Sequence, residues 1–181
     1  MKYPTAADIE DMVARGFDPS VIVEQRVLCE RGKKLLAIRA AAVEAFSHVV
    51  LGAGVGLLEA NGLDDYADEA ALAAFREQDE KQDWSAIPCD HLQRYGCSLS
   101  YFDAEGMRFH LPAFLIAEID QAASTGVLYA LTRSMQMQAQ YVLLNPAQRR
   151  VVRDFLAFAL EDDSYAWDWD HIRSALENHW S

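Results

Sequence analysis

Acidic side chains with the spacing of a polar site cluster in the middle of the chain. They are Glu59, Asp64, Asp65, Asp79 and Asp83. Carboxylates that a fold brings together can transfer protons or bind a hard divalent cation. Their spacing is not that of a calcium loop, and no Glu-x-x-His pair accompanies them. Structural caps and ion pairs are therefore the first interpretation, a partner or ligand surface is the second, and a metal or catalytic site is the third.

A single arginine, Arg108, is the basic group that we expect to meet these carboxylates. A guanidinium beside aromatic residues can clamp a carboxylate, and the nearest candidates belong to this chain. We predict that the fold brings Glu59, Asp64 and Arg108 into a buried or half-buried cluster. The full set that we assign to this binding or structural site is Glu59, Asp64, Asp65, Tyr66, Asp79, Trp84 and Arg108. No catalytic residue is assigned.

The cysteines and histidines predict neither a metal nor a cofactor. Cys89-x-His91 with Cys97 resembles half of a zinc site, but the spacing matches no common zinc knuckle. The third cysteine, Cys29, lies far away in the sequence, and an odd number of cysteines suits a reducing compartment. The first residues lack the apolar segment of a signal peptide. We therefore expect a cytoplasmic protein that folds without metal.

Composition places the chain among soluble, acidic, globular domains. It has 181 residues, of which 51% are hydrophobic, and a net charge of −12, which argues against binding to a phosphate backbone. No apolar run is long enough to cross a membrane. Residues 52–83 carry nine acidic side chains against Arg76 and Lys81. This segment is either a solvated face or a docking surface for a basic partner.

A long helix is predicted near the N-terminus. Asp18 and Pro19 form a helix start, and two apolar columns then repeat every seven residues as far as Val50. Residues 19–51 form either one helix or two with a bend at Gly32. Their apolar stripe is longer than a small domain needs. Either a second copy covers it in a homodimer through residues 19–51, or the rest of the chain does.

A small β-hairpin is predicted in the second half of the chain. Residues 98–102 and 107–110 alternate apolar and polar side chains around a turn that ends at Gly106. The other segments favour helices, among them the one that begins at Asn145-Pro146. The fold class that we predict is mainly α with one small β-hairpin, in a single globular domain with a long N-terminal helix.

Part of the chain resembles an uncharacterised bacterial domain family of unknown function. The likeness covers roughly residues 42–160 and is strongest over 99–114, where aromatic, Arg and Pro positions coincide. It divides the chain into an N-terminal helical extension (1–41), a family-like core (42–160) and a C-terminal helix packed on that core (161–181). The resemblance implies no catalytic residue and no cofactor.

These observations favour a cytoplasmic, non-enzymatic interaction domain that regulates or neutralises a protein partner of basic character. Neither a nucleic acid nor a membrane is expected as a partner. The alternative is a small-ligand-binding protein or a hydrolase-type enzyme that uses Glu59, Asp64, Asp79 and Arg108. Convergence of these four side chains in one cleft would favour the alternative.

Overall fold

The computed structural model describes residues 3–121 and 125–180, and the secondary structure within these ranges is entirely helical. The α-helices are α1 (Ala6–Ala14), α2 (Pro19–Phe46), α3 (Leu57–Asp64), α4 (Glu69–Gln78), α5 (Cys89–Arg94), α6 (Ala104–Ile119), α7 (Val127–Arg133), α8 (Met137–Gln140), α9 (Pro146–Ala159) and α10 (Trp169–Asn178). Three 3-10 turns, η1 (Trp84–Ala86), η2 (Gly96–Ser100) and η3 (Asp163–Asp168), connect them. No helix within the described ranges is long and apolar enough to cross a membrane.

The N-terminal helix predicted over residues 19–51 forms one uninterrupted element, α2, which ends at Phe46. Asp18 caps it by accepting a hydrogen bond from the backbone N–H of Ser20 at 2.8 Å, and Pro19 occupies its first turn. Gly32 does not bend it. A Cβ atom on Gly32 would lie 2.6 Å from Cβ of Tyr3, so the glycine provides the space in which the N-terminal segment crosses α2.

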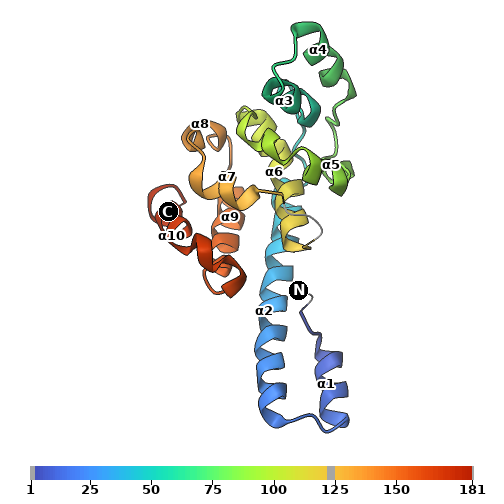
Figure 1. Cartoon of the computed structure of the whole chain (residues 1–181), viewed down its shortest axis with the longest axis vertical. Helices are drawn as coiled ribbons and strands as arrows, with labels where there is room; N and C mark the ends of the chain where they lie inside the picture. The colour runs from blue at the N-terminus through green and yellow to red at the C-terminus, as the bar shows by residue number, and fades with distance from the viewer. Residues whose placement is uncertain (1–2, 122–124, 181) are drawn as a thin grey trace.

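The molecule is elongated along α2 (Figure 1). We call α1 and the part of α2 before Arg31 the arm, and this helical hairpin extends from one end of the molecule. Helices α3 and α4 lie at the opposite end. The accessible surface is 10259 Å², whereas a compact protein of this mass would expose about 8,800 Å². An elongated shape exposes more surface than a compact one of the same mass.

Helix α6 is the centre of the core. It packs against α2, α5, α7, α8 and η1, and eleven of its sixteen residues are buried. Phe109, Leu111 and Phe114 are completely buried. Helix α9 lies on α2 and carries Val152, Phe155 and other fully buried residues into the same core. The rest of the chain therefore covers much of the apolar stripe on α2.

The predicted β-hairpin is wrong. The segment expected to form its first strand is mostly the 3-10 turn η2, and the segment expected to form its second strand lies inside α6. Asp103 is the N-cap of α6, where its side chain accepts a hydrogen bond from the N–H of Gly106 at 2.8 Å. Eleven of the sixteen residues of α6 are buried and none is exposed, so its polar face is weak and its sequence can imitate the alternation of a strand. The mainly α part of the prediction is confirmed.

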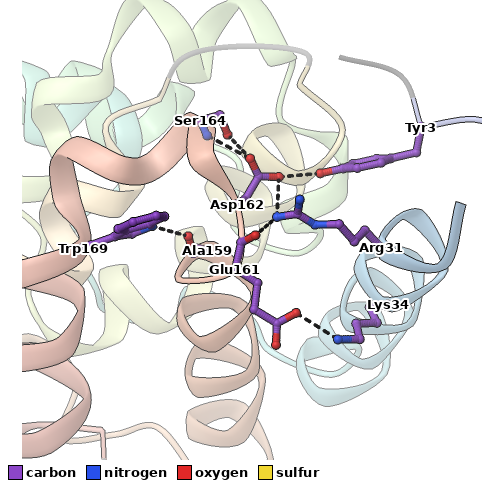
Figure 2. A network of polar contacts seen from close by, with 8 residues as sticks. All are labelled: Tyr3, Arg31, Lys34, Ala159, Glu161, Asp162, Ser164 and Trp169. Atoms are coloured by element: carbon purple, nitrogen blue, oxygen red, sulfur yellow. Dashed lines mark hydrogen bonds and ion pairs between the residues drawn. The ribbon is translucent and has the colours of Figure 1, made fainter. Parts of the chain in front are cut away.

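Polar contacts attach the base of the arm to the C-terminal part of the chain (Figure 2). The Tyr3 hydroxyl donates to the Asp162 carboxylate at 2.6 Å, and Arg31 forms an ion pair with the same carboxylate at 3.7 Å. Arg31 also donates to the Glu161 carbonyl, and the Lys34 ammonium lies 2.9 Å from the Glu161 carboxylate. Three residues, Tyr3, Arg31 and Lys34, thereby tie the N-terminal segment and α2 to the residues that follow α9.

Asp162 is the centre of this network. Besides the Tyr3 hydroxyl, its carboxylate accepts hydrogen bonds from the backbone N–H and hydroxyl of Ser164, at 2.9 and 2.7 Å. These hydrogen bonds outweigh the effect of burial and lower the pKa of Asp162. Burial, followed by the bond to Asp162, raises the pKa of Tyr3 to about 12. Nearby, the Trp169 indole N–H donates to the Ala159 carbonyl at 3.1 Å and fixes α10 on α9.

Candidate functional site

The acidic segment folds into a separate pair of helices, which we call the acidic lobe (residues 52–83). It consists of α3, α4 and the loops beside them, and α3 packs on α4. Gly62 permits this packing, because a Cβ there would lie 2.8 Å from the Phe75 ring and 2.9 Å from Leu72. The lobe carries nine acidic residues and two basic ones, a net charge of −7.

Glu59 is the most buried carboxylate of the lobe, with 4% of the residue exposed. Its partner is Arg76 on α4, whose Nε lies 2.9 Å from Oε2 of Glu59 and whose Nη2 contacts Oε1. This hydrogen bonding raises the pKa of Arg76. The predicted partner, Arg108, forms no ion pair with the described residues; it lies half-buried on α6, and its buried Nε has no hydrogen-bond partner among them.

Asp79 caps the N-terminal end of α3, the end that also carries Glu59. Its carboxylate accepts hydrogen bonds from the backbone N–H groups of Leu58 at 2.7 Å and Glu59 at 3.1 Å, so it caps the first turn of the helix. Burial raises the pKa of Asp79 against the opposing effect of these bonds. Gly56 allows the approach, because a Cβ there would lie 2.1 Å from Oδ2 of Asp79.

The remaining assigned carboxylates lie at the C-terminal end of α3, beside two tyrosines. A hydrogen bond with Asp64 is the first cause of the raised pKa of Tyr101. Asp65 accepts a hydrogen bond from the Asn61 amide at 2.9 Å. Tyr66 is 94% exposed, and its φ of 56° lies in the left-handed region that residues other than glycine rarely adopt. We call Asp64, Asp65, Tyr66 and Tyr101 the acidic-tyrosine patch.

Trp84 is buried and has a structural role. It is 6% exposed, and its indole N–H donates to the Phe46 carbonyl at 2.9 Å, which satisfies one of the free carbonyl groups at the end of α2. Nearby, the backbone N–H of Leu51 donates to the Lys81 carbonyl at 2.9 Å. These bonds attach the loop after α4 to the end of α2.

The fold thus brings Glu59 and Asp79 together at the start of α3 and places Asp64, Asp65 and Tyr66 at its end. It does not pair Arg108 with any of them. Sequence reasoning missed Arg76 and Tyr101. A signal for Arg76 exists, because the lobe has only two basic residues and a buried Glu59 needs one nearby. Tyr101 gave no such signal, since its proximity to Asp64 depends on the packing of η2 against α3.

No metal-binding cluster is found in the part of the chain that the structure describes, where no three His, Cys, Asp or Glu side chains are placed to hold an ion. Cys89 is half-buried, Cys97 is exposed, and both are free thiols. The residues near α3 can form ion pairs and caps, and the patch at its end can offer carboxylates and aromatic faces to a partner.

Comparison with known proteins identifies the family. The family of unknown function DUF6714 matches residues 35–181, and the chain belongs to it. The match begins within α2, so the arm lies outside the matched segment. No curated protein and no solved structure matches the chain.

Proposed function

We propose that this protein is a non-enzymatic interaction domain of the cytoplasm that regulates or neutralises a partner by binding a basic segment of it on the acidic-tyrosine patch. The single observation that carries the proposal is Tyr66, a large aromatic side chain exposed to 94% among carboxylates. Tyrosine is enriched at the energetic centres of interfaces, because it contributes large contact area and a hydroxyl.

The charge of the lobe supports a basic partner. Of its two basic side chains, Arg76 is engaged by Glu59, which leaves Lys81 as the other positive group on the lobe. A negative surface of this kind accelerates the approach of a positive segment and disfavours acidic partners. The faces of Tyr66 and Tyr101 can in addition receive an arginine or lysine through cation–π contacts.

The separation of the polar groups supports a non-enzymatic role over the alternative. Glu59 is neutralised by Arg76, Asp79 is used as the cap of α3, and Asp64 lies close enough to the Tyr101 hydroxyl to raise its pKa. Each carboxylate thus has a local structural partner. A hydrolytic site would need an acid and a base that face one reacting atom at hydrogen-bond distance.

A fluorescence anisotropy titration tests the proposal. The probe is a labelled short peptide of alternating arginine and glycine, with a glutamate–glycine peptide as the negative control. We expect saturable binding of the basic peptide that weakens as salt rises, because exposed charges are screened. Tyr66→Ala should weaken binding roughly two- to fivefold, the size of an exposed cation–π contact.

Tyr129→Ala provides a matched control, since Tyr129 is also exposed but lies beside Arg133, 5.6 Å from the ring centroid, instead of carboxylates. This variant should bind like the wild type. Equal weakening by Tyr129→Ala and Tyr66→Ala, or no binding of the basic peptide, would contradict the proposal.

We further propose that a second copy of the chain packs on α2. Leu36 and Val43 lie on one face of α2 and are 64% and 41% exposed. Leu36 lines a cavity of about 640 Å³, and Val43 lines an adjoining cavity of about 420 Å³. Both cavities include Asp120, which forms an ion pair with Arg39 at 2.9 Å. An apolar face with balanced charges is self-complementary, as a two-fold interface requires. The basic flank of α2 is engaged within the chain, so apolar contacts must provide most of the stability of such a dimer.

A further inference from the structure

A small cleft lies where the acidic lobe meets α5 and α6. Its volume is about 210 Å³. The apolar part of its wall comes from Leu57, Leu58, Ala86, Ile87 and Pro88, and the polar part from Gln78, Asp79, Glu80, His91 and His110. The cleft is separate from the acidic-tyrosine patch, which lies at the other end of α3.

His110 is the unusual member of this wall. It is 1% exposed on α6, and its Nδ1 lies 2.7 Å from the carbonyl oxygen of Gly106. Because a carbonyl oxygen only accepts, Nδ1 carries the hydrogen and donates. Phe102 stacks on the imidazole with ring centroids 4.3 Å apart, and Phe109 meets it edge-on at 4.9 Å. The ring is therefore fixed in both orientation and tautomer.

The other ring nitrogen of His110 is a buried acceptor without a donor. Burial lowers the pKa of His110 to about 4, so the imidazole is neutral at neutral pH and Nε2 presents a lone pair. No described residue donates a hydrogen bond to Nε2. A buried polar atom without a partner is costly, and a ligand that brings an N–H group to it recovers that cost.

Two carboxylates in the same wall determine the charge that the cleft prefers. Asp79 is 8% exposed and held by the N–H groups of α3. Glu80 accepts hydrogen bonds from the backbone N–H groups of the next three residues at 2.8 to 3.0 Å, which fixes its side chain. Both are immobilised, and no cationic side chain among the described residues donates a hydrogen bond to either of them. The two oxygens of Asp79, which accept one bond each, and Oε2 of Glu80 retain lone pairs for a further donor, whereas Oε1 of Glu80 is occupied by the three backbone groups.

We propose that this cleft binds a small primary ammonium ion, which donates one N–H to Nε2 of His110 and the others toward Asp79 and Glu80. An ammonium carries three donors and a positive charge, and its short alkyl chain would lie on Leu57, Ile87 and Pro88. An anion is disfavoured by the two carboxylates, and a neutral alcohol gains only the single bond to His110. The inference does not depend on the proposed function of the acidic-tyrosine patch.

The test follows the imidazole nitrogen signals of the full chain by long-range ¹H–¹⁵N correlation while propylammonium chloride is added. We expect a saturable shift of the His110 Nε2 signal toward that of a hydrogen-bonded nitrogen. The His171 signal, from an exposed side chain on α10, should stay in place. Propanol and sodium propionate are the neutral and anionic probes of the same size.

Two variants separate the parts of the proposal. Glu80→Gln keeps an oxygen acceptor for the backbone N–H groups but removes the charge, so it should weaken propylammonium binding roughly two- to fivefold. His110→Phe keeps a ring between Phe102 and Phe109 and should abolish saturable binding, followed through the Leu58 amide signal. Propanol binding as tight as propylammonium, or no saturable shift in the wild type, would overturn the proposal.

Discussion

Three buried or half-buried carboxylates among the described residues are each held by specific local partners. Glu59 is neutralised by Arg76, Asp79 by the N-terminus of α3, and Asp162 by Tyr3 and Ser164. Such carboxylates are stabilised as anions only while the partner is present, because an unpaired buried charge is strongly destabilising. His110 differs from these carboxylates, because it is buried in its neutral form.

The protonation of His110 makes stability depend on pH. The pKa of the folded state, about 4, is below the unfolded value of about 6.5, so the unfolded chain takes up the proton first as pH falls. The stability that neutral His110 contributes to the folded state is complete above pH about 6.5 and is lost as pH falls toward about 4. When pH falls from about 7 to about 4.5, we expect the titration of His110 to lower the free energy of unfolding by about 2–3 kcal/mol.

Urea unfolding at both pH values measures this effect, with His110→Phe as the reference. The reference is needed because Asp79 and Glu118, whose pKa values are raised by burial, act in the opposite direction in acid, and Asp103 favours the protonated imidazole. The loss on acidification should be smaller in the variant than in the wild type. An identical loss in both proteins would show that His110 is not the group that titrates.

Residue pairing was the least predictable feature at this scale. Arg108 was the obvious basic partner from sequence, because it falls in the segment with the strongest family resemblance. The structure uses Arg76 instead, since α3 and α4 form a hairpin that places their facing side chains together. Such a pairing depends on the angle at which two helices meet, which no local pattern specifies.

At the scale of elements, the capped helices were predictable and the buried one was not. Asp18-Pro19 and Asn145-Pro146 begin α2 and α9 as expected, because the capping residue and proline act locally. Helix α6 has only a weak polar face, and Pro112 lies in its middle. Proline removes one hydrogen bond there, and only the surrounding core compensates for it. The alternation of apolar and polar residues that indicated a hairpin is a local pattern, and it carries no information about this packing.

The cap of α6 provides a test of this element. The Asp103 carboxylate accepts hydrogen bonds from Gly106 at 2.8 Å and from Val55 at 3.1 Å, so it joins α6 to the loop before α3. We expect Asp103→Ala to lower the unfolding free energy by about 1–2 kcal/mol. Asp68→Ala is the matched control, because Asp68 caps α4 through one bond to Ala71 and should cost about 0.5–1 kcal/mol.

Chemical denaturation followed by circular dichroism measures both variants. The order of the two losses is the informative result, since Asp103 alone connects two segments. A smaller loss for Asp103→Ala than for Asp68→Ala would contradict the role that we give to this cap.

At the scale of the whole molecule, α2 connects three parts: the arm, the central core and, beyond its C-terminal end, the acidic lobe (Figure 1). The chain covers one column of the apolar stripe through α6 and α9, but it leaves Leu36 and Val43 exposed. A sequence repeat predicts that a stripe exists. It does not predict which side is covered, because that depends on where distant helices return to the same axis.

Light scattering tests the proposed second copy. We expect the full chain at micromolar concentration to have twice the mass of one 20.3 kDa chain. Leu36→Glu should reduce it to a single chain, because a charge replaces an apolar contact at the centre of the interface. Val27→Glu is the control, since Val27 is 57% exposed on the opposite side of α2 and should leave the dimer intact. A monomeric wild type would rule out the dimer.

Binding of a basic segment on the acidic-tyrosine patch can be located residue by residue through the backbone amide shifts of the full chain. On addition of the unlabelled arginine–glycine peptide, we expect saturable shifts around Asp64, Asp65, Tyr66 and Tyr101 that are lost in Tyr66→Ala. Shifts centred on the Leu36–Val43 face of α2, or spread evenly over all exposed acidic residues, would contradict it.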